Sequence, residues 1–144
     1  MPTGLNIMQG LFGGMALLAW VSPVTAQDAP VALPGGSVAT LVGTDLRLAL
    51  TDVTDTRCQS EVACVWEGTI RLVLAIDPGG PTAQTIVLCN ACEDGGGVAT
   101  AAGHQFDFVG LEPATKIIEA LGRPARIGDY TGIVQITPLS GMAN

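Results

Sequence analysis

Positively charged residues are scarce in this chain of 144 residues. Six Lys and Arg stand against thirteen Asp and Glu, which gives a net charge of −7 at pH 7. All nineteen of these residues lie beyond residue 27. An acidic chain with six scattered cations lacks the positive surface that binds phosphate backbones or anionic membranes. We therefore expect neither nucleic acid nor anionic lipid as a partner.

Histidine occurs once, at His104, which excludes metal sites and catalytic constellations that need two histidines. We expect His104 in an exposed loop position at the start of a strand. The chain has no phosphate-binding glycine loop followed by a helix. Its acidic pair Glu93-Asp94 also lacks the alternating oxygen ligands of an EF-hand. The sequence thus predicts no catalytic residue, no metal site and no cofactor.

Aromatic residues are few as well. Beyond residue 26 they are Trp66, Phe106, Phe108 and Tyr130. The core must therefore consist mostly of Val, Leu, Ile and Ala. Glu61 and Glu67 lack the aromatic-rich groove that would hold a sugar between two catalytic carboxylates, so we interpret them as solvated loop charges.

The N-terminal residues resemble an export signal without a basic start. Ile7 to Val21 is apolar apart from Gln9, and it is short for a membrane span. Small or short side chains at Val24 and Ala26 predict cleavage before Gln27. No cysteine lies there to carry a lipid, so we expect a signal peptide over residues 1–26 and a soluble periplasmic or secreted protein. An uncleaved membrane anchor is the alternative.

After a leader that we expect to be flexible, residues 27–36, short stretches with period-2 alternation predict strands in one domain, residues 37–140. These stretches are 37–42, 46–51, 69–76, 84–89, 105–109 and 130–137. With turn signals between them and no alternation of strands and helices, they predict an all-β antiparallel sandwich or small barrel of about six to eight strands. Helical spacing near residues 114–121 allows one short helix.

Four cysteines in an exported domain most often form two disulfides, and four allow three connectivities. Cys58 and Cys64 enclose a short loop, whereas Cys89 and Cys92 form a C-x-x-C motif. Local pairing, Cys58 with Cys64 and Cys89 with Cys92, is our preferred interpretation because each partner is already held nearby. Each small ring would contribute roughly 2 kcal/mol to stability.

Two other chemistries compete for these cysteines. Redox catalysis by Cys89 and Cys92 would need the first thiol at a helix N-terminus, but the motif follows a strand and precedes E-D-G-G-G. A zinc site would need two close pairs of thiolates, and one pair here is spaced C-x5-C. We therefore favour structural disulfides and keep redox chemistry as the alternative.

The stretch from Asp55 to Gly68 concentrates charge, cysteine and tryptophan in one loop. Arg57 can form charge-assisted hydrogen bonds with Asp55 and Glu61. We expect Trp66 to cap the end of the core, and Gly68 to permit a tight turn or bulge. The stretch is thus a candidate binding or structural loop. It either makes a rigid corner or presents a recognition surface on a rigid scaffold.

The sequence D-T-R-C-Q-S-E-V-A-C-V-W-E-G of this stretch resembles the D-S-R-C-P-x-x-V-x-C-x-W-A-G pattern of small secreted or lipid-anchored bacterial proteins of unknown function. The residues carried over are Asp55, Arg57, Cys58, Val62, Cys64, Trp66 and Gly68. The chain departs from the pattern at Gln59 and Glu67 and adds Cys89 and Cys92. The resemblance implies an exported all-β domain with Cys58 bonded to Cys64, and it supplies no activity.

These observations favour a binding or structural module of unknown ligand that is not an enzyme. We expect a monomer that binds an unidentified protein or small molecule and does not insert stably into a membrane after cleavage. One alternative is a thiol-disulfide redox protein using Cys89 and Cys92. Another is a small inhibitor or envelope-stress factor that presents the loop between Cys58 and Cys64.

Overall fold

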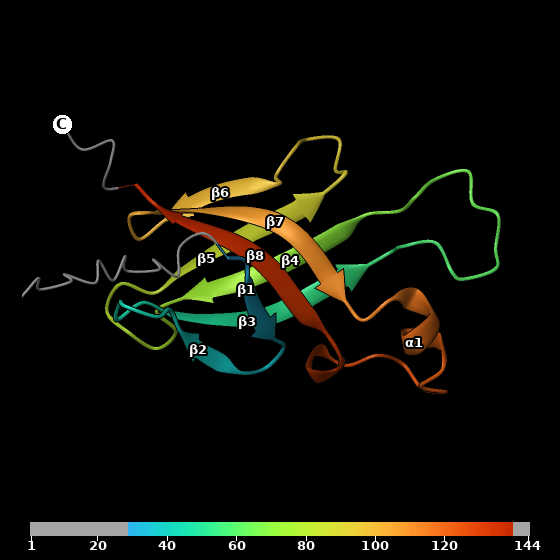
Figure 1. Ribbon diagram of the computed structural model, residues 1–144, viewed down its shortest axis with the longest axis horizontal. Helices are drawn as coiled ribbons and strands as arrows, with labels where there is room; N and C mark the ends of the chain where they lie inside the picture. The colour runs from blue at the N-terminus through green and yellow to red at the C-terminus, as the bar shows by residue number, and fades with distance from the viewer. Residues whose placement is uncertain (1–28, 140–144) are drawn as a thin grey trace, which may run out of the picture.

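The computed structural model describes residues 29–139, which form two four-stranded sheets packed face to face (Figure 1). The first sheet has the order β1 (Val31–Pro34), β8 (Thr131–Pro138), β7 (His104–Glu112) and β6 (Val98–Ala101). The second has the order β2 (Val38–Thr40), β3 (Arg47–Asp55), β4 (Ile70–Ile76) and β5 (Gln84–Asn90). All strand pairs are antiparallel. The predicted all-β sandwich is confirmed, and it is not a closed barrel. The predicted signal peptide lies outside the described residues.

The core lies between the two sheets and follows from the alternation of side chains along the strands. On β4, Ile70, Leu72, Leu74 and Ile76 are buried, and Leu72 and Leu74 are completely shielded from solvent. They meet the inner face of the other sheet, whose largest fully buried side chain is Phe106. Because side chains of a strand alternate between faces, the intervening residues of β4 remain outside.

Three strands differ from the prediction. β1 lies within the segment that we expected to be a flexible leader, because its backbone pairs with the last strand, Val31 opposite Val134. Pro34 is tolerated there because β1 is an edge strand. β3 continues to Asp55, beyond the predicted strand 46–51, with an irregular register between Leu50 and Asp52. β6 was not predicted, since its sequence carries no strong alternation.

Within residues 29–139, helical structure is limited to short segments. The α-helix α1 spans Thr115–Glu119, within the range near 114–121 where the spacing predicted a short helix. None of its residues is buried. A 3-10 turn, η2 (Ile127–Asp129), precedes β8. No helix in residues 29–139 is long and apolar enough to cross a membrane.

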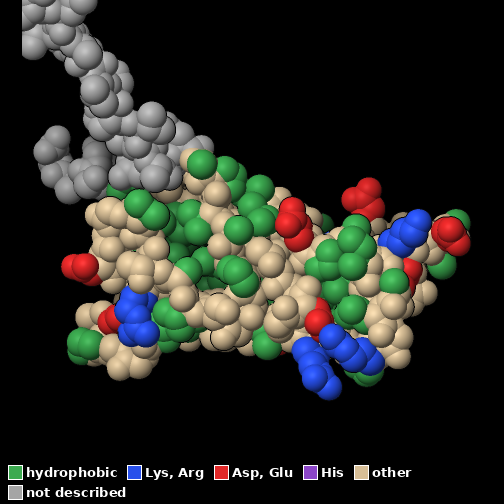
Figure 2. All heavy atoms as spheres, turned by 60° about the horizontal axis from the view of Figure 1, so that its bottom comes forward, with side chains coloured by type: hydrophobic (Ala, Val, Ile, Leu, Met, Phe, Trp, Pro, Cys, Tyr) green, Lys and Arg blue, Asp and Glu red, His purple; other side chains and the backbone are tan. Residues whose placement is uncertain are grey.

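The loops gather at two ends of the sandwich. The loop between β3 and β4 projects beyond the strands at one end, where α1 also lies (Figure 1). The turn between β2 and β3 lies at the opposite end of β3, where Arg47 Nη1 donates to the carbonyl of Pro78 at 3.2 Å. Figure 2 shows charged side chains toward both ends of one face, with hydrophobic and uncharged side chains between them.

Candidate functional site

Two disulfides brace the end of the sandwich that carries the long loop. Cys58 is bonded to Cys64, with 6.0 Å between their Cα atoms, and Cys89 is bonded to Cys92, with 5.9 Å between theirs. The preferred local pairing is therefore confirmed. All four sulfurs are engaged in these bonds, so they offer no thiolates to zinc. Residues 29–139 hold no group of three or more His, Cys, Asp or Glu side chains arranged for a metal ion.

Two threonines close the base of the β3–β4 loop. One directly follows β3 and the other directly precedes β4. Thr56 N donates to Thr69 O at 3.0 Å, and Thr69 N donates back to Thr56 Oγ1 at 2.9 Å. Gly68 has φ of 77°, and a Cβ at this position would collide with the carbonyl oxygen of Thr56. This position therefore requires glycine both for its conformation and for its close approach to Thr56.

Arg57 joins the loop to the other sheet. Its Nε and Nη2 donate to the two carboxylate oxygens of Asp55, each at 2.8 Å. The same guanidinium donates to the carbonyls of Leu111 at 3.3 Å and Pro113 at 2.9 Å. The expected pair with Asp55 is present, but Glu61 is not among the hydrogen-bond partners of Arg57 in the described part of the chain. Arg57 therefore ties the start of the loop to the segment at the end of β7.

The electrostatics of this pair follow from its partial burial. Burial alone raises the pKa of Asp55, but hydrogen bonds from Arg57 and from the Tyr130 side chain, with the Arg57 charge, outweigh it and hold the pKa below the ordinary value. The hydrogen bond to Asp55 raises the pKa of Arg57. Burial and then the Asp55 charge raise the pKa of Tyr130. Asp55 is consequently a stable carboxylate held by donors, which suits a structural role better than acid-base chemistry.

A second set of hydrogen bonds restrains the part of the loop that lies inside the disulfide ring. Ser60 N donates to Glu119 Oε1 at 2.9 Å, and Ser60 Oγ makes a short hydrogen bond to Glu119 Oε2. Glu119 ends α1, so the helix supports the loop from the side. Sequence reasoning missed this contact because 59 residues separate the partners and neither is distinctive by itself.

Trp66 projects from the loop into solvent. Its side chain is 79% exposed, and that of its neighbour Val65 is 95% exposed. The expectation that Trp66 caps the end of the core is therefore wrong. The loop leaves the sandwich before it reaches Trp66, and Tyr130 is the aromatic residue outside the strands that is buried in the core. A large exposed aromatic side chain on a covalently braced loop is a typical feature of a contact surface.

Two shallow hollows have Trp66 in their lining, and residues of the two disulfide-bonded segments lie together there. Trp66, Thr69 and Ala91 line both hollows. The first also includes Arg71, Cys92, Glu93 and Asp94. The second also includes Thr56, Val65, Glu67 and Gly68. The C-x-x-C turn thus lies beside Trp66, a proximity that the sequence separation of the two segments does not reveal.

The Cys89–Cys92 bond lacks the setting of a thioredoxin-type dithiol. Cys89 is buried, with 4% of its surface exposed, and it ends a strand rather than preceding a helix. The backbone N–H of Cys89 donates to Gly96 O at 2.7 Å, which closes the turn on itself. A cation lies beside this bond, because Arg71 Nη2 is 3.8 Å from Cys92 Sγ.

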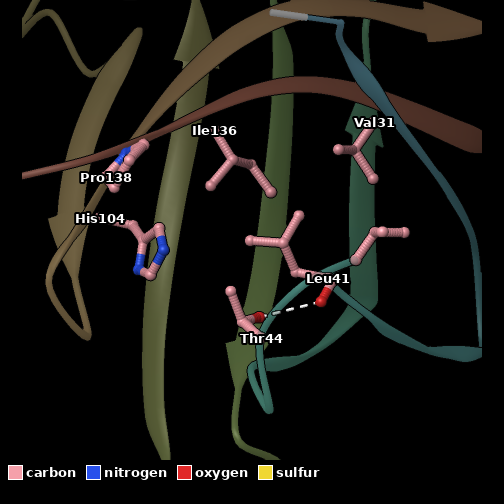
Figure 3. A pocket seen from close by; sticks show the side chains of 7 residues that line it. Val31, Leu41, Thr44, His104, Ile136 and Pro138 are labelled. Atoms are coloured by element: carbon pink, nitrogen blue, oxygen red, sulfur yellow. Dashed lines mark hydrogen bonds between the residues drawn. The ribbon is translucent and has the colours of Figure 1, made fainter. Parts of the chain in front are cut away.

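A small apolar pocket lies near the opposite end of the sandwich (Figure 3). The side chains of Val31, Leu41 and Ile136 converge there, with His104 and Pro138 at one side. His104 is half-buried at the first residue of β7 rather than in an exposed loop, and its Nδ1 lies 2.9 Å from Ala102 O. Thr44 Oγ1 donates to Leu41 O at 2.9 Å and fixes the turn below. The aliphatic lining and single imidazole suggest packing rather than chemistry.

Comparison of the chain with family models, with curated proteins and with solved structures gives no significant match. The resemblance carried by Asp55 to Gly68 therefore remains a prediction from the motif itself.

Proposed function

We propose that the protein is an exported, disulfide-stabilised binding module that is not an enzyme and that contacts its partner through the end of the sandwich carrying Trp66. The motif from Asp55 to Gly68 would place it among the small exported bacterial proteins that this motif resembles. Two disulfides agree with an oxidising compartment outside the cytoplasm. Together with the apolar N-terminal sequence, they support a periplasmic or secreted location.

The exposure of Trp66 on a braced loop carries this proposal. The ring of Cys58 and Cys64, the Arg57 contacts and the hydrogen bonds from Ser60 to Glu119 restrict the loop before any partner arrives. A preformed loop loses little conformational entropy on binding. Burial of an indole contributes favourably at about 25 cal/mol per Å² of apolar surface removed from water.

A site-specific cross-linker at Val65 tests the proposal, since this exposed residue adjoins Trp66. Cells that produce the protein with p-benzoylphenylalanine at position 65 are irradiated, and the adducts are identified by mass spectrometry. The control carries the cross-linker at Val42, which is 78% exposed in the turn between β2 and β3 at the opposite end of β3. We expect a discrete adduct from position 65 that Trp66→Ala removes. Equal labelling from both positions, or none from position 65, would contradict the proposal.

Thiol-disulfide exchange at Cys89 and Cys92 is the second candidate, and one contact favours it. The Arg71 guanidinium beside Cys92 Sγ would stabilise a thiolate there after reduction. This candidate predicts that Cys89 and Cys92 alkylate under mild reduction while Cys58 and Cys64 remain bonded. It also predicts insulin reduction that Cys89→Ser abolishes. Intact mass after alkylation, with and without prior reduction, separates the two candidates.

A further inference from the structure

The apolar surface around Trp66 is bordered by acidic side chains. Trp66, Val65 and Ala91 supply its hydrophobic area, and they lie on the two segments that the disulfides brace. Three acidic residues, Glu67, Glu93 and Asp94, are among the residues that line these two hollows, together with one basic residue, Arg71. We refer to the surface formed by Trp66, Val65, Ala91, Glu67, Glu93 and Asp94 as the Trp66 platform.

The charge of the platform indicates the chemistry of its occupant. The surrounding protein is acidic as well, with a net charge of −7. A partner that approaches such a surface gains on-rate and specificity from positive charge. An exposed indole is also the aromatic side chain that attracts a guanidinium or ammonium group most strongly, and carboxylates beside the ring reinforce that attraction.

We propose that the Trp66 platform binds a cationic polypeptide segment, with an Arg or Lys side chain placed over the Trp66 ring and neighbouring cations paired with Glu67, Glu93 and Asp94. The proposal rests on the binding function proposed above and specifies the chemistry of the partner. Both hollows are lined by Trp66, Thr69 and Ala91 and therefore adjoin, so an extended segment can run from one hollow into the other past Trp66.

Three other kinds of occupant can be compared with a cationic segment on the Trp66 platform. A neutral oligosaccharide also stacks on tryptophan, and its hydroxyl groups can donate to carboxylates, but it has no positive charge to complement the acidic surface. An acidic partner is repelled at short range. A second copy of this chain would bring an equally acidic surface to the contact. Charge complementarity therefore favours the cationic segment.

Peptide titration tests the proposal on the exported protein in its oxidised form. The probe is a fluorescein-labelled nonapeptide of alternating Arg and Gly, with Ser-Gly and Glu-Gly peptides of equal length for comparison, and anisotropy reports binding. Trp66 fluorescence gives an independent reading of binding. The sequence has one other tryptophan, Trp20, whose emission overlaps with that of Trp66 where it is retained. Intact mass establishes whether residue 20 is retained, and Trp20→Phe isolates the signal of Trp66 if it is.

We expect the Arg-Gly peptide to bind and to change Trp66 fluorescence, and the Ser-Gly and Glu-Gly peptides to do neither. The double variant Glu67→Gln/Asp94→Asn should weaken binding about fivefold, from about 0.5 kcal/mol for each exposed charge pair. The matched variant Asp45→Asn/Asp52→Asn removes the same charge elsewhere and should leave affinity within about twofold. Trp66→Ala should abolish binding, and Trp66→Phe should restore part of it.

Several results would overturn the proposal. They are equal binding to Trp66→Ala, equal weakening by the two double variants, or a Trp66 response to chitohexaose in place of the cationic peptide. If the Val65 cross-linker still yields a Trp66-dependent adduct in those cases, the binding function stands and the cationic chemistry fails. If the cross-linker yields no such adduct and no peptide binds, both proposals fail.

Discussion

The Arg57 guanidinium donates to both carboxylate oxygens of Asp55, with Nε to Oδ1 and Nη2 to Oδ2 each at 2.8 Å. The same group also satisfies the carbonyls of Leu111 and Pro113, on a segment 54 and 56 residues further along the chain. A planar guanidinium with five donors can serve all of these acceptors at once, whereas a lysine cannot. The loop that carries Trp66 is therefore joined to the opposite sheet through one side chain.

Replacement of Arg57 should destabilise the whole domain. In Arg57→Ala, the half-buried Asp55 carboxylate and two carbonyls lose their donors, and we expect a loss of about 1–3 kcal/mol in the free energy of unfolding. Urea denaturation of the oxidised protein measures it. The control Lys116→Ala removes one exposed positive charge from α1 and should change stability by less than about 0.5 kcal/mol. Equal stability of the two variants would show that the Arg57 contacts contribute little.

The pH dependence of stability should report the same ion pair. The pKa of Asp55 in the folded protein lies below its ordinary value, because the donors around it outweigh the cost of burial. An Asp in the unfolded chain has a pKa of about 3.9, so the contribution of the Asp55 carboxylate to stability is fully present above that pH. It is lost as the pH falls through the lower folded pKa.

Comparison with Asp55→Asn isolates this contribution from other carboxylates, including Asp129, whose pKa the hydrogen bond from Arg123 also lowers. We expect wild type to be more stable than Asp55→Asn at pH 7, and this difference to shrink as the pH falls below about 4. Urea unfolding between pH 7 and pH 2 measures both proteins. A difference that stays constant over this range would exclude Asp55 as the titrating group.

The sequence predicted the part of the fold that depends on local pattern. Alternation along β4 identified a half-buried strand, and the spacing of the cysteines favoured the two short-range disulfides that are present. It missed β1, because prolines and glycines around Val31–Pro34 suggest a loop. Pairing with β8, at the far end of the chain, makes this segment a strand nonetheless.

The candidate site also combines contacts that the local sequence predicts with contacts that depend on tertiary structure. The pair Asp55 and Arg57 is only two residues apart and was predicted, whereas the carbonyl partners of Arg57 and the tie from Ser60 to Glu119 depend on tertiary structure. Trp66 was misplaced because a large apolar residue beside a strand fits a core cap and an exposed platform equally well. Only the path of the loop decides between these two positions.

Gly68 should tolerate alanine far less well than another glycine of similar conformation. Both Gly68 and Gly79 have positive φ, at 77° and 76°, but a Cβ at Gly79 meets nothing within 4 Å. Gly79→Ala should therefore cost only the conformational penalty of about 1–2 kcal/mol. Gly68→Ala adds a clash with the Thr56 carbonyl and should cost at least about 1 kcal/mol more. Thermal and urea unfolding measure both variants, and equal losses would show that the base of the loop relaxes freely.

The hydrogen bonds from Ser60 to Glu119 should restrict the loop without contributing much to global stability. Glu119 is exposed and Ser60 is half-buried, so Glu119→Ala removes an acceptor that water can replace, and the free energy of unfolding should fall by less than about 1 kcal/mol. Local opening of the loop should nevertheless become more frequent. Hydrogen exchange of the amides in residues 58–66 should then be faster, while β4 and β8 remain protected as in wild type. Faster exchange in β4 would indicate that α1 supports the sandwich itself, and unchanged exchange throughout would mean that the disulfide alone holds the loop.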